Sequence, residues 1–394
     1  MWEFKDKVAV AGVGYSKIGR RVKESLASLT VNAVDAALAD AGLTRADLDG
    51  LGTSPSMPRY GGEKGHTEGI DVVDPWRLAE RLGIGEQMGW TGSTNGMVTQ
   101  AFMDGAMAVI SGVCKYAIVY RALHVPPGSY VNFEAKYAEG SEQWHAPFGF
   151  SVPPSWAAVV MRRYYELYGY SRADFARFIV DNRSNTIKNP NGYWREPLTV
   201  DDYLKPRMIA DPMSVLDCDI PIDGACALLL TRTERARDLR KPPALVSGFA
   251  ASTHPIPPGG SFTLEDILQG SDQVARRLWS ATGFGPKDID VAQLYDGFSI
   301  FVVTWLEGMG FLPKGEAMAF LREGRGALDG ELPINTNGGA LGEGRLHGMS
   351  HLSEAVIQVT DRGGARQVAG ANRSIATISN GLEKATAFVF SRDA

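Results

Sequence analysis

A glycine-rich stretch near the C-terminus holds the residue types with the clearest chemical potential. It reads NTNGGALGEGRLHGMSH over residues 335–351, with five glycines and two histidines ahead of an apolar pattern of helical spacing. Glycines let a backbone approach a ligand closely, and histidines bind metals or move protons. The stretch therefore fits three kinds of site: a phosphate-cradling loop, a metal site, or a loop that carries acid–base groups to a reacting carbon.

The sequence disfavours a metal site. His347 and His351 are four residues apart, but a zinc site requires further ligands and no third one is nearby. The three cysteines show no metal-site spacing, and their odd number is typical of a reducing compartment: Cys114, Cys218 and Cys226. We therefore predict no metal and a cytoplasmic location.

A phosphate or dinucleotide loop is also disfavoured. The stretch GVGYSKIG at residues 12–19 follows a strand-like segment, but its spacing is not GxGxxG. The chain has 394 residues and a formal net charge of −5, which gives no support for nucleic-acid binding. The N-terminal segment lacks the pattern of a signal peptide, and no apolar run is long enough to span a bilayer. We expect no nucleic-acid partner and no membrane span.

The elements that must position these residues alternate between strands and helices. KVAVAGVGYSKIG reads as a buried strand entering a turn, and residues 28–42 follow with the apolar spacing of a helix. Three pairs of segments recur in the same order. They are ALADAGLTRADLDGLG with RLWSATGFGPKDIDVAQLYD, NGMVTQAFMDGAMAVISG with HGMSHLSEAVIQVTDRGG, and CKYAIVYRA with RSIATISNG. Three matches in order indicate two repeated halves.

We therefore predict an α/β protein built from two mixed-sheet halves, residues 1–243 and 244–394. The seam lies near the proline pair of RKPPALVSGFA. An insertion at about residues 124–221 is rich in aromatics and proline and is expected to cap the active face.

Four stretches give the chain a resemblance to the thiolase superfamily, and within it to lipid-transfer or sterol-carrier-X-type thiolase-like proteins. They are GWTGSTNGMVTQAFMDGAMAVISG, the segment from NRSNTIKNPNG to DIPIDGACALLLT, LYDGFS, and NTNGGALGEGRLHGMSHLSEAVIQ. The resemblance implies a thiolase fold, in which two repeated mixed-sheet α/β halves form a layered α-β-α-β-α core. It also implies a homodimer.

The catalytic positions differ from those of a thiolase. The family's nucleophilic cysteine falls on Ser93, and no cysteine follows Cys226, where the family has its second one. Tyr295 stands at the family's asparagine, and Arg345 or, with loop slippage, His347 stands at its histidine. The chain thus resembles thiolase-like retro-aldolases that shorten steroid side chains with a small zinc-ribbon/OB-fold partner. Some of those aldolases carry a tyrosine where this chain has Arg345.

On this resemblance, we expect cleavage without a covalent intermediate. Tyr295 is the expected base, Arg345 the positive charge that lowers its pKa, and His347 a proton carrier near neutral pH. Ser93 is an alternative nucleophile, although its place before a helix also suits capping. Backbone N–H groups of residues 338–344 are expected to hold the thioester oxygen. The expected substrate contacts are Asn95, Asp296, Gly338, Gly339 and Gly344.

The predicted function is a carbon–carbon lyase that performs retro-aldol cleavage of a β-hydroxyacyl-CoA side chain, on a steroid, to give a ketone and a short acyl-CoA. Acyl-CoA is the substrate and no cofactor is expected. Two other functions stay open: an acyltransferase that uses Ser93, and a non-catalytic lipid-transfer subunit.

Overall fold

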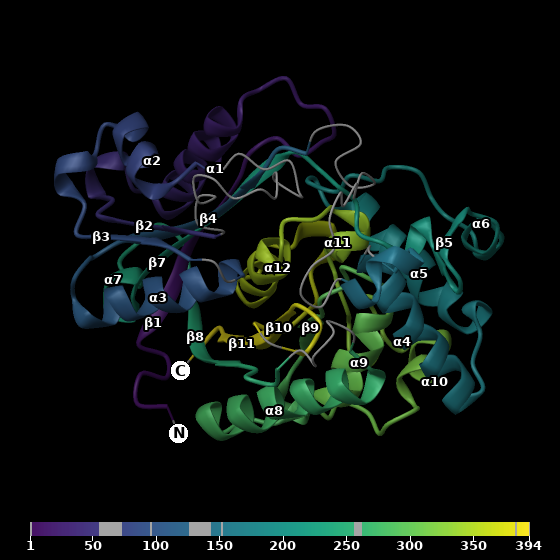
Figure 1. Ribbon diagram of the computed structural model, residues 1–394. Coiled ribbons are helices and arrows are strands. Elements are labelled where there is room, and N and C mark those ends of the chain that lie inside the picture. Colours follow the sequence, from purple (N-terminus) through teal and green to yellow (C-terminus); the bar gives the residue numbers. More distant parts are fainter. Residues whose placement is uncertain are drawn as a thin grey trace.

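The computed structural model describes residues 2–54, 73–94, 97–125, 143–150, 153–255, 262–382 and 384–393. Asn95, a predicted substrate contact, lies outside these residues. Within them, the main sheet has nine strands in the order β3-β2-β4-β7-β1-β8-β11-β10-β9 (Figure 1). These strands are β1 (Val8–Tyr15), β2 (Gly50–Thr53), β3 (Trp90–Ser93), β4 (Ala117–Leu123), β7 (Gly224–Arg232), β8 (Ala244–Ala251), β9 (Val291–Gln293), β10 (Arg373–Ile378) and β11 (Thr386–Ser391).

The strand order repeats in the two halves of the sheet, read outward from the join of β1 and β8. β1 is antiparallel to β7, β7 is antiparallel to β4, and β4 is parallel to β2. β8, β11, β10 and β9 repeat these three relations. β3 has its counterpart in a parallel bridge between Ala292 and Ile334. The three sequence echoes fall on matching elements of this repeat, whereas the domain boundary at residues 243 and 244 stays a prediction.

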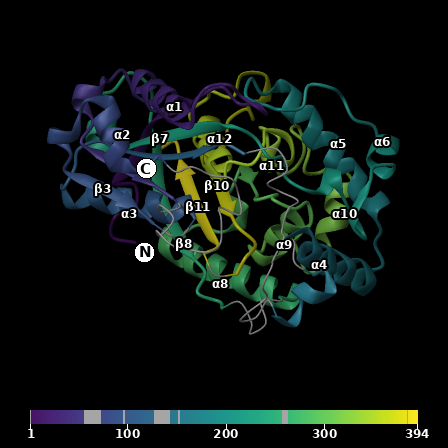
Figure 2. The same cartoon turned by 45° about the horizontal axis from the view of Figure 1, so that its top comes forward.

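Helices form three layers, with one half of the sheet between each pair of layers (Figures 1 and 2). Alternate strand residues explain this arrangement, because side chains along a strand point to opposite faces. On β4, Val119 packs in the central cluster with α3 and α12, whereas Tyr120 packs in an outer cluster with α1 and α2. The other outer layer contains α8 and α9. The result is the predicted α-β-α-β-α core.

The helices outside the insertion are α1 (Leu26–Ala41), α2 (Pro75–Leu82), α3 (Val98–Ser111), α7 (Thr233–Ala236), α8 (Leu264–Thr282), α9 (Ile300–Gly308), α10 (Ala317–Arg322), α11 (Gly339–Gly342) and α12 (Met349–Val359). The short 3₁₀ turns are η1 (Arg45–Asp47), η2 (Gly85–Gln87), η4 (Ala146–Phe148), η5 (Val215–Asp217), η6 (Pro286–Asp288) and η7 (Gly364–Arg366). In the described part of the chain, no helix has both the length and the apolar character that crossing a bilayer requires.

The insertion packs against the second half of the core, at the right of Figure 1. Its elements are α4 (Pro153–Tyr168), α5 (Arg172–Lys188), α6 (Val200–Leu204), β5 (Met208–Ala210) and β6 (Met213–Ser214). α5 reaches the glycine-rich loop, where Asn182 Nδ2 donates to the Gly338 carbonyl at 2.7 Å. The insertion therefore supports the loop that carries the predicted site.

Candidate active site

The glycine-rich loop is held by packing that leaves no room for side chains. A Cβ on Gly339 would lie 2.1 Å from Asp296 Oδ2, and one on Gly342 would lie 1.8 Å from Thr186 Oγ1. Contacts below 3 Å between such atoms do not occur in folded proteins, so glycine is required at both positions. These glycines thus allow the loop backbone to pack closely against the side chains of Asp296 and Thr186, which belong to the same chain.

Asp296 fixes this loop from the end of β9. Its side chain is fully buried and accepts hydrogen bonds from the backbone N–H of Ala340 at 2.6 Å and of Leu341 at 3.3 Å. His351 Nε2 donates to the same carboxylate at 2.9 Å and is also fully buried. The oxygens of Asp296 are occupied inside the core, and its predicted contact with substrate stays a prediction. Asp296 and His351 orient the loop.

The loop N–H groups predicted to hold a thioester oxygen are also occupied. The N–H of Gly338 donates to the Asn335 carbonyl at 2.8 Å, and the N–H of Gly339 donates to Asn337 Oδ1 at 2.9 Å. Both glycines are buried. The N–H groups of Gly338 and Gly339 thus have partners within the loop, and substrate binding by Gly338, Gly339 and Gly344 stays a prediction.

His347 faces a buried arginine that the sequence motifs did not single out. Arg121, on β4, is 2% exposed, and its Nε and Nη2 lie 3.2 and 2.7 Å from His347 Nδ1. A guanidinium only donates hydrogen bonds, so Nδ1 must carry the lone pair and the proton of the neutral ring must sit on Nε2. His347 has a left-handed backbone, with φ of +52°, which turns its ring out of the helical path of α12.

Burial, with the nearby charges of Arg121 and Arg345, holds the pKa of His347 well below its usual range. The expectation of a proton carrier that titrates near neutral pH is therefore wrong. The imidazole instead stays neutral with its proton on Nε2, and a neutral N–H group is a donor type that suits an oxygen that becomes negative during reaction.

Arg345 is the second positive charge near His347. Its side chain is 7% exposed and its Nε lies 3.9 Å from Asp219 Oδ2. Its backbone N–H donates to the Ile220 carbonyl at 2.9 Å. Arg345 is thus part of a buried charged cluster beside His347, whereas its predicted effect on the pKa of Tyr295 stays a prediction.

Tyr295 lies two residues beyond the end of β9 and is partly buried. Its backbone N–H donates to Thr377 Oγ1 at 3.1 Å, and its ring lies 5.6 Å from the ring of His351. A Cβ on Gly297 would come within 2.8 Å of the Tyr295 hydroxyl oxygen, so the phenol folds back over that glycine. Tyr295 thus lies near the end of a strand, and its role as the base stays a prediction.

Ser93 ends β3 and is exposed. The predicted capping role is wrong, because the N-cap of α3 is Met97. Thr53 of β2 pairs with Ser93 on one side and with Tyr120 of β4 on the other. Two strand spacings separate Ser93 from Tyr120, about 10 Å between backbones. Ser93 therefore lies at the same edge of the sheet as Arg121.

A buried acidic network lies beneath the loop. Glu343 is 1% exposed, and its Oε2 accepts from Asn189 Nδ2 at 2.7 Å and from Asn337 Nδ2 at 2.8 Å. Burial raises the pKa of Glu343 to about 7, and the neighbouring Glu354 adds to the rise. Glu354 is paired with Arg366, at 3.0 Å. The network ties the loop to α5 and α12.

One sequence signal could have identified Arg121, which is the only charged residue of AIVYRAL, a strand buried at every position. A charge there needs a buried partner.

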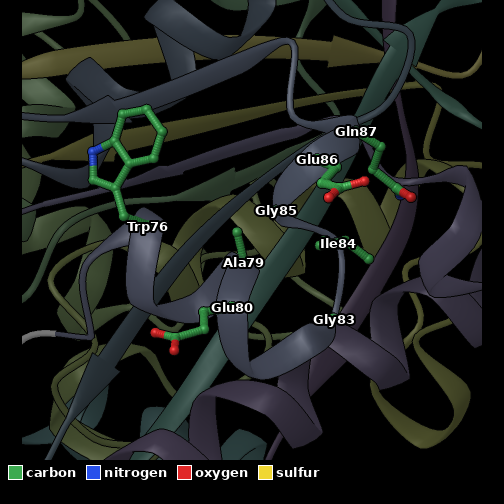
Figure 3. Close-up of a pocket in the computed structure, with 8 residues that line it drawn as sticks. All are labelled: Trp76, Ala79, Glu80, Gly83, Ile84, Gly85, Glu86 and Gln87. Atoms are coloured by element: carbon green, nitrogen blue, oxygen red, sulfur yellow. The ribbon is translucent and has the colours of Figure 1, made fainter.

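Among the residues that the structure describes, no three His, Cys, Asp or Glu side chains are grouped so that they could hold a metal ion. A hollow of about 710 Å³ along α2 and η2 contains none of the predicted site residues (Figure 3); it is lined by Trp76, Ala79, Glu80, Gly83, Ile84, Gly85, Glu86 and Gln87.

Comparisons with known proteins agree with this architecture. A family model described as thiolase C-terminal domain-like matches residues 262–392. A steroid side-chain-cleaving aldolase of Thermomonospora curvata is 35% identical over 363 residues, which cover 88% of this chain and 89% of that protein. The 17-hydroxy-3-oxo-4-pregnene-20-carboxyl-CoA lyase of Mycobacterium tuberculosis is 32% identical over 393 residues, 95% of this chain and 97% of that protein.

A solved structure of the Ltp2-ChsH2(DUF35) aldolase matches with a TM-score of 0.85 and 31% sequence identity, and the match covers 98% of both chains. The expected thiolase fold is therefore confirmed over nearly the whole chain.

Proposed function

This chain belongs to the thiolase-fold family that contains these steroid-cleaving lyases, and we propose that it cleaves a carbon–carbon bond by a retro-aldol reaction. Its substrate is a β-hydroxyacyl-CoA side chain on a steroid, and its products are a ketone and a short acyl-CoA. The observation that carries this function is the identity of 35% and 32% to two such lyases along nearly their full lengths.

The state of the cysteines also argues against thiolase chemistry. Cys114 and Cys226 are buried and Cys218 is partly buried. Burial raises the pKa of Cys114 to about 12, and it raises the pKa values of the other two thiols further. A thiol acts as a nucleophile through its thiolate, which these environments disfavour. A reaction without an acyl-enzyme fits the chain better.

The proposed mechanism uses three side chains. The Tyr295 phenolate, favoured by the charge of Arg345, takes the proton of the β-hydroxyl group. The Cα–Cβ bond then breaks, the β-carbon becomes a ketone, and the electron pair moves into the enolate of the departing thioester. The Nε2–H of neutral His347 donates to the enolate oxygen. The proton held by Tyr295 passes to Cα, so the reaction needs no cofactor.

The test is a cleavage assay with a steroid β-hydroxyacyl-CoA, in which ketone and acyl-CoA are separated and quantified. Tyr295→Phe should lower kcat by about 10²-fold or more and leave the Kd for a non-cleavable acyl-CoA unchanged. Tyr116→Phe is the matched control, since Tyr116 is a partly buried tyrosine just before β4, at the opposite edge of the sheet. An acyl group trapped on Ser93 would instead identify an acyltransferase. Lipid binding without turnover would identify a carrier.

We further propose a small DUF35-type partner of zinc-ribbon/OB-fold build. The support is that the solved aldolase of similar fold is named as Ltp2 with ChsH2(DUF35), and the zinc-ribbon/OB-fold build is the expectation drawn from the resemblance of the sequence. Purifying the chain with and without the candidate partner, and comparing kcat, tests this proposal. A kcat that is equal in both preparations would contradict it.

A homodimer is proposed on the character of β3, which is an edge strand of the sheet with partly exposed residues. Edge strands offer unpaired backbone groups to another strand. Light scattering should give twice the chain mass of 42.6 kDa.

We also propose a cytoplasmic location, which the free thiols of all three cysteines support.

A further inference from the structure

The loop between β1 and α1 carries a cluster of cations that the mechanism does not use. Its four basic side chains are exposed and occur within seven residues: Lys17, Arg20, Arg21 and Lys23. They surround a hollow of about 500 Å³, together with Gly19, Val22 and Glu24. Glu24 lies 3.6 Å from Lys17. Among the described residues, no carboxylate pairs with the other three cations, although the whole chain has a net charge of −5.

This loop is fixed in place by a buried carboxylate. Asp223 is 1% exposed, and its Oδ2 accepts from the Val22 N–H at 2.8 Å while its Oδ1 accepts from the Val125 N–H at 2.7 Å. Its backbone exchanges two hydrogen bonds with Gly19, at 2.7 and 3.0 Å. The cations are therefore held close together, which costs energy through their mutual repulsion unless an anion binds between them.

The position of the loop relates it to the candidate active site. β1 and β4 are both antiparallel to β7, so their carboxyl ends lie at one edge of the sheet. The loop crosses that edge at the top of Figure 1, and His124 Nε2 lies 3.3 Å from the Val22 carbonyl. His124 is three residues beyond Arg121, which is about 10 Å along an extended strand. Arg121 in turn contacts His347.

The length of an acyl-CoA can be compared with this path of about 10 Å along β4. The pantetheine arm has about as many linking bonds as four residues of extended chain, so it spans roughly 14 Å. With its thioester at His347, its phosphates would reach the cations of the loop. A guanidinium group can bind two phosphate oxygens at once, and Arg20 and Arg21 both line the hollow.

We propose that residues 17–23 bind the 3′-phosphate and pyrophosphate of the CoA substrate. The proposal rests on the function proposed above for its choice of ligand. It assigns the nucleotide end of the substrate to the first half of the sheet, and the acyl end to the loop of the second half.

The experiment compares two substrates with the same acyl group, a CoA thioester and a pantetheine thioester that lacks the nucleotide. In Arg20→Gln/Arg21→Gln, KM for the CoA thioester should rise about tenfold or more, with kcat unchanged and with KM for the pantetheine thioester unchanged. The control Arg237→Gln/Lys287→Gln removes two exposed charges at the opposite edge and should change neither KM.

A second measurement does not depend on turnover. Calorimetry with adenosine 3′,5′-bisphosphate should show binding to the unmodified protein that Arg20→Gln/Arg21→Gln weakens about tenfold. This binding would support the site even if no thioester were cleaved, so the two proposals can fail separately. Equal binding by the double variant, or an equal KM rise for both thioesters, would overturn the site.

Discussion

Replacing Glu343 by glutamine should change how the stability of the protein depends on pH. The folded protein raises the pKa of Glu343 from 4.5 to about 7, chiefly because the carboxyl group is buried. The folded state therefore binds a proton that the unfolded state releases. The resulting stability is fully present below pH 4.5 and is lost as pH rises through about 7.

The size of the effect follows from these two pKa values. A difference of one in pKa between the folded and unfolded states corresponds to about 1.36 kcal/mol, so the full loss is about 3.4 kcal/mol, of which about 2.5 kcal/mol falls between pH 5 and pH 8. With an unfolding entropy of about 2.1 cal/mol/K per residue over this chain, 2.5 kcal/mol corresponds to a change in Tm of about 3 °C. Glu343→Gln imitates the neutral carboxyl group and should lack this change.

The assay is thermal unfolding of both proteins at half-unit steps from pH 5 to pH 8, with exposed Glu86→Gln as the control. The Tm difference between Glu343→Gln and the unmodified protein should grow with pH by about 3 °C, in favour of the variant. A constant difference across the range would refute the argument, because it would mean that Glu343 is ionised throughout. Glu86→Gln should follow the unmodified protein at every pH.

Two further changes test the site. Burial is the main reason why the pKa of His347 is low, and Arg121 adds to it. Arg121→Gln removes this added charge, so kcat should fall about tenfold and the acid limb of the pH–rate profile should move toward neutral pH, whereas Arg121→Lys keeps a cation and should retain the flat acid side. Identical profiles for the two variants would contradict the assigned role. Gly342→Ala places a Cβ against Thr186 Oγ1 and should lower the free energy of unfolding by about 2 kcal/mol, as measured by urea unfolding. Adding Thr186→Ala should restore at least half of this lost free energy. If it restores none, the strain does not come from this contact.

Much of the fold is predictable from the sequence because the same order of elements occurs in both halves of the chain. The two copies of helix, strand and long central helix preserve their order, and each copy folds into the same strand arrangement. Local patterns of apolar spacing are sufficient for this, since each segment forms its element largely independently of the other copy. The predicted capping role of Ser93 was wrong because residues 90–93 pair as a strand with β2 and α3 begins only at Val98. The local sequence does not reveal this pairing with a distant strand.

The site was less predictable because its decisive contacts are between distant residues. The roles of Tyr295 and Arg345 were inferred from their positions in motifs, and they stay predictions. The contact of Arg121 with His347 joins residues 226 apart, and it reverses the expected titration of the histidine. Likewise, the pKa of Glu343 depends on its depth of burial and on the nearby carboxylate of Glu354, neither of which local spacing encodes.

The seam between the two halves of the sheet is narrow. β1 and β8 pair through Ala9 with Leu245 and Val10 with Ala244, whereas β1 follows β7 along its whole length. The halves are also joined through the buried cluster between them, where Phe102 of α3 packs against Phe388 and Phe390 of β11. Arg121 and His347 lie on the two sides of this joint. A slight rotation of one half against the other would alter the imidazole before any helix or strand was lost. On heating, catalysis should thus fail before the fold does, and the gap between the two midpoints would measure the stiffness of the joint.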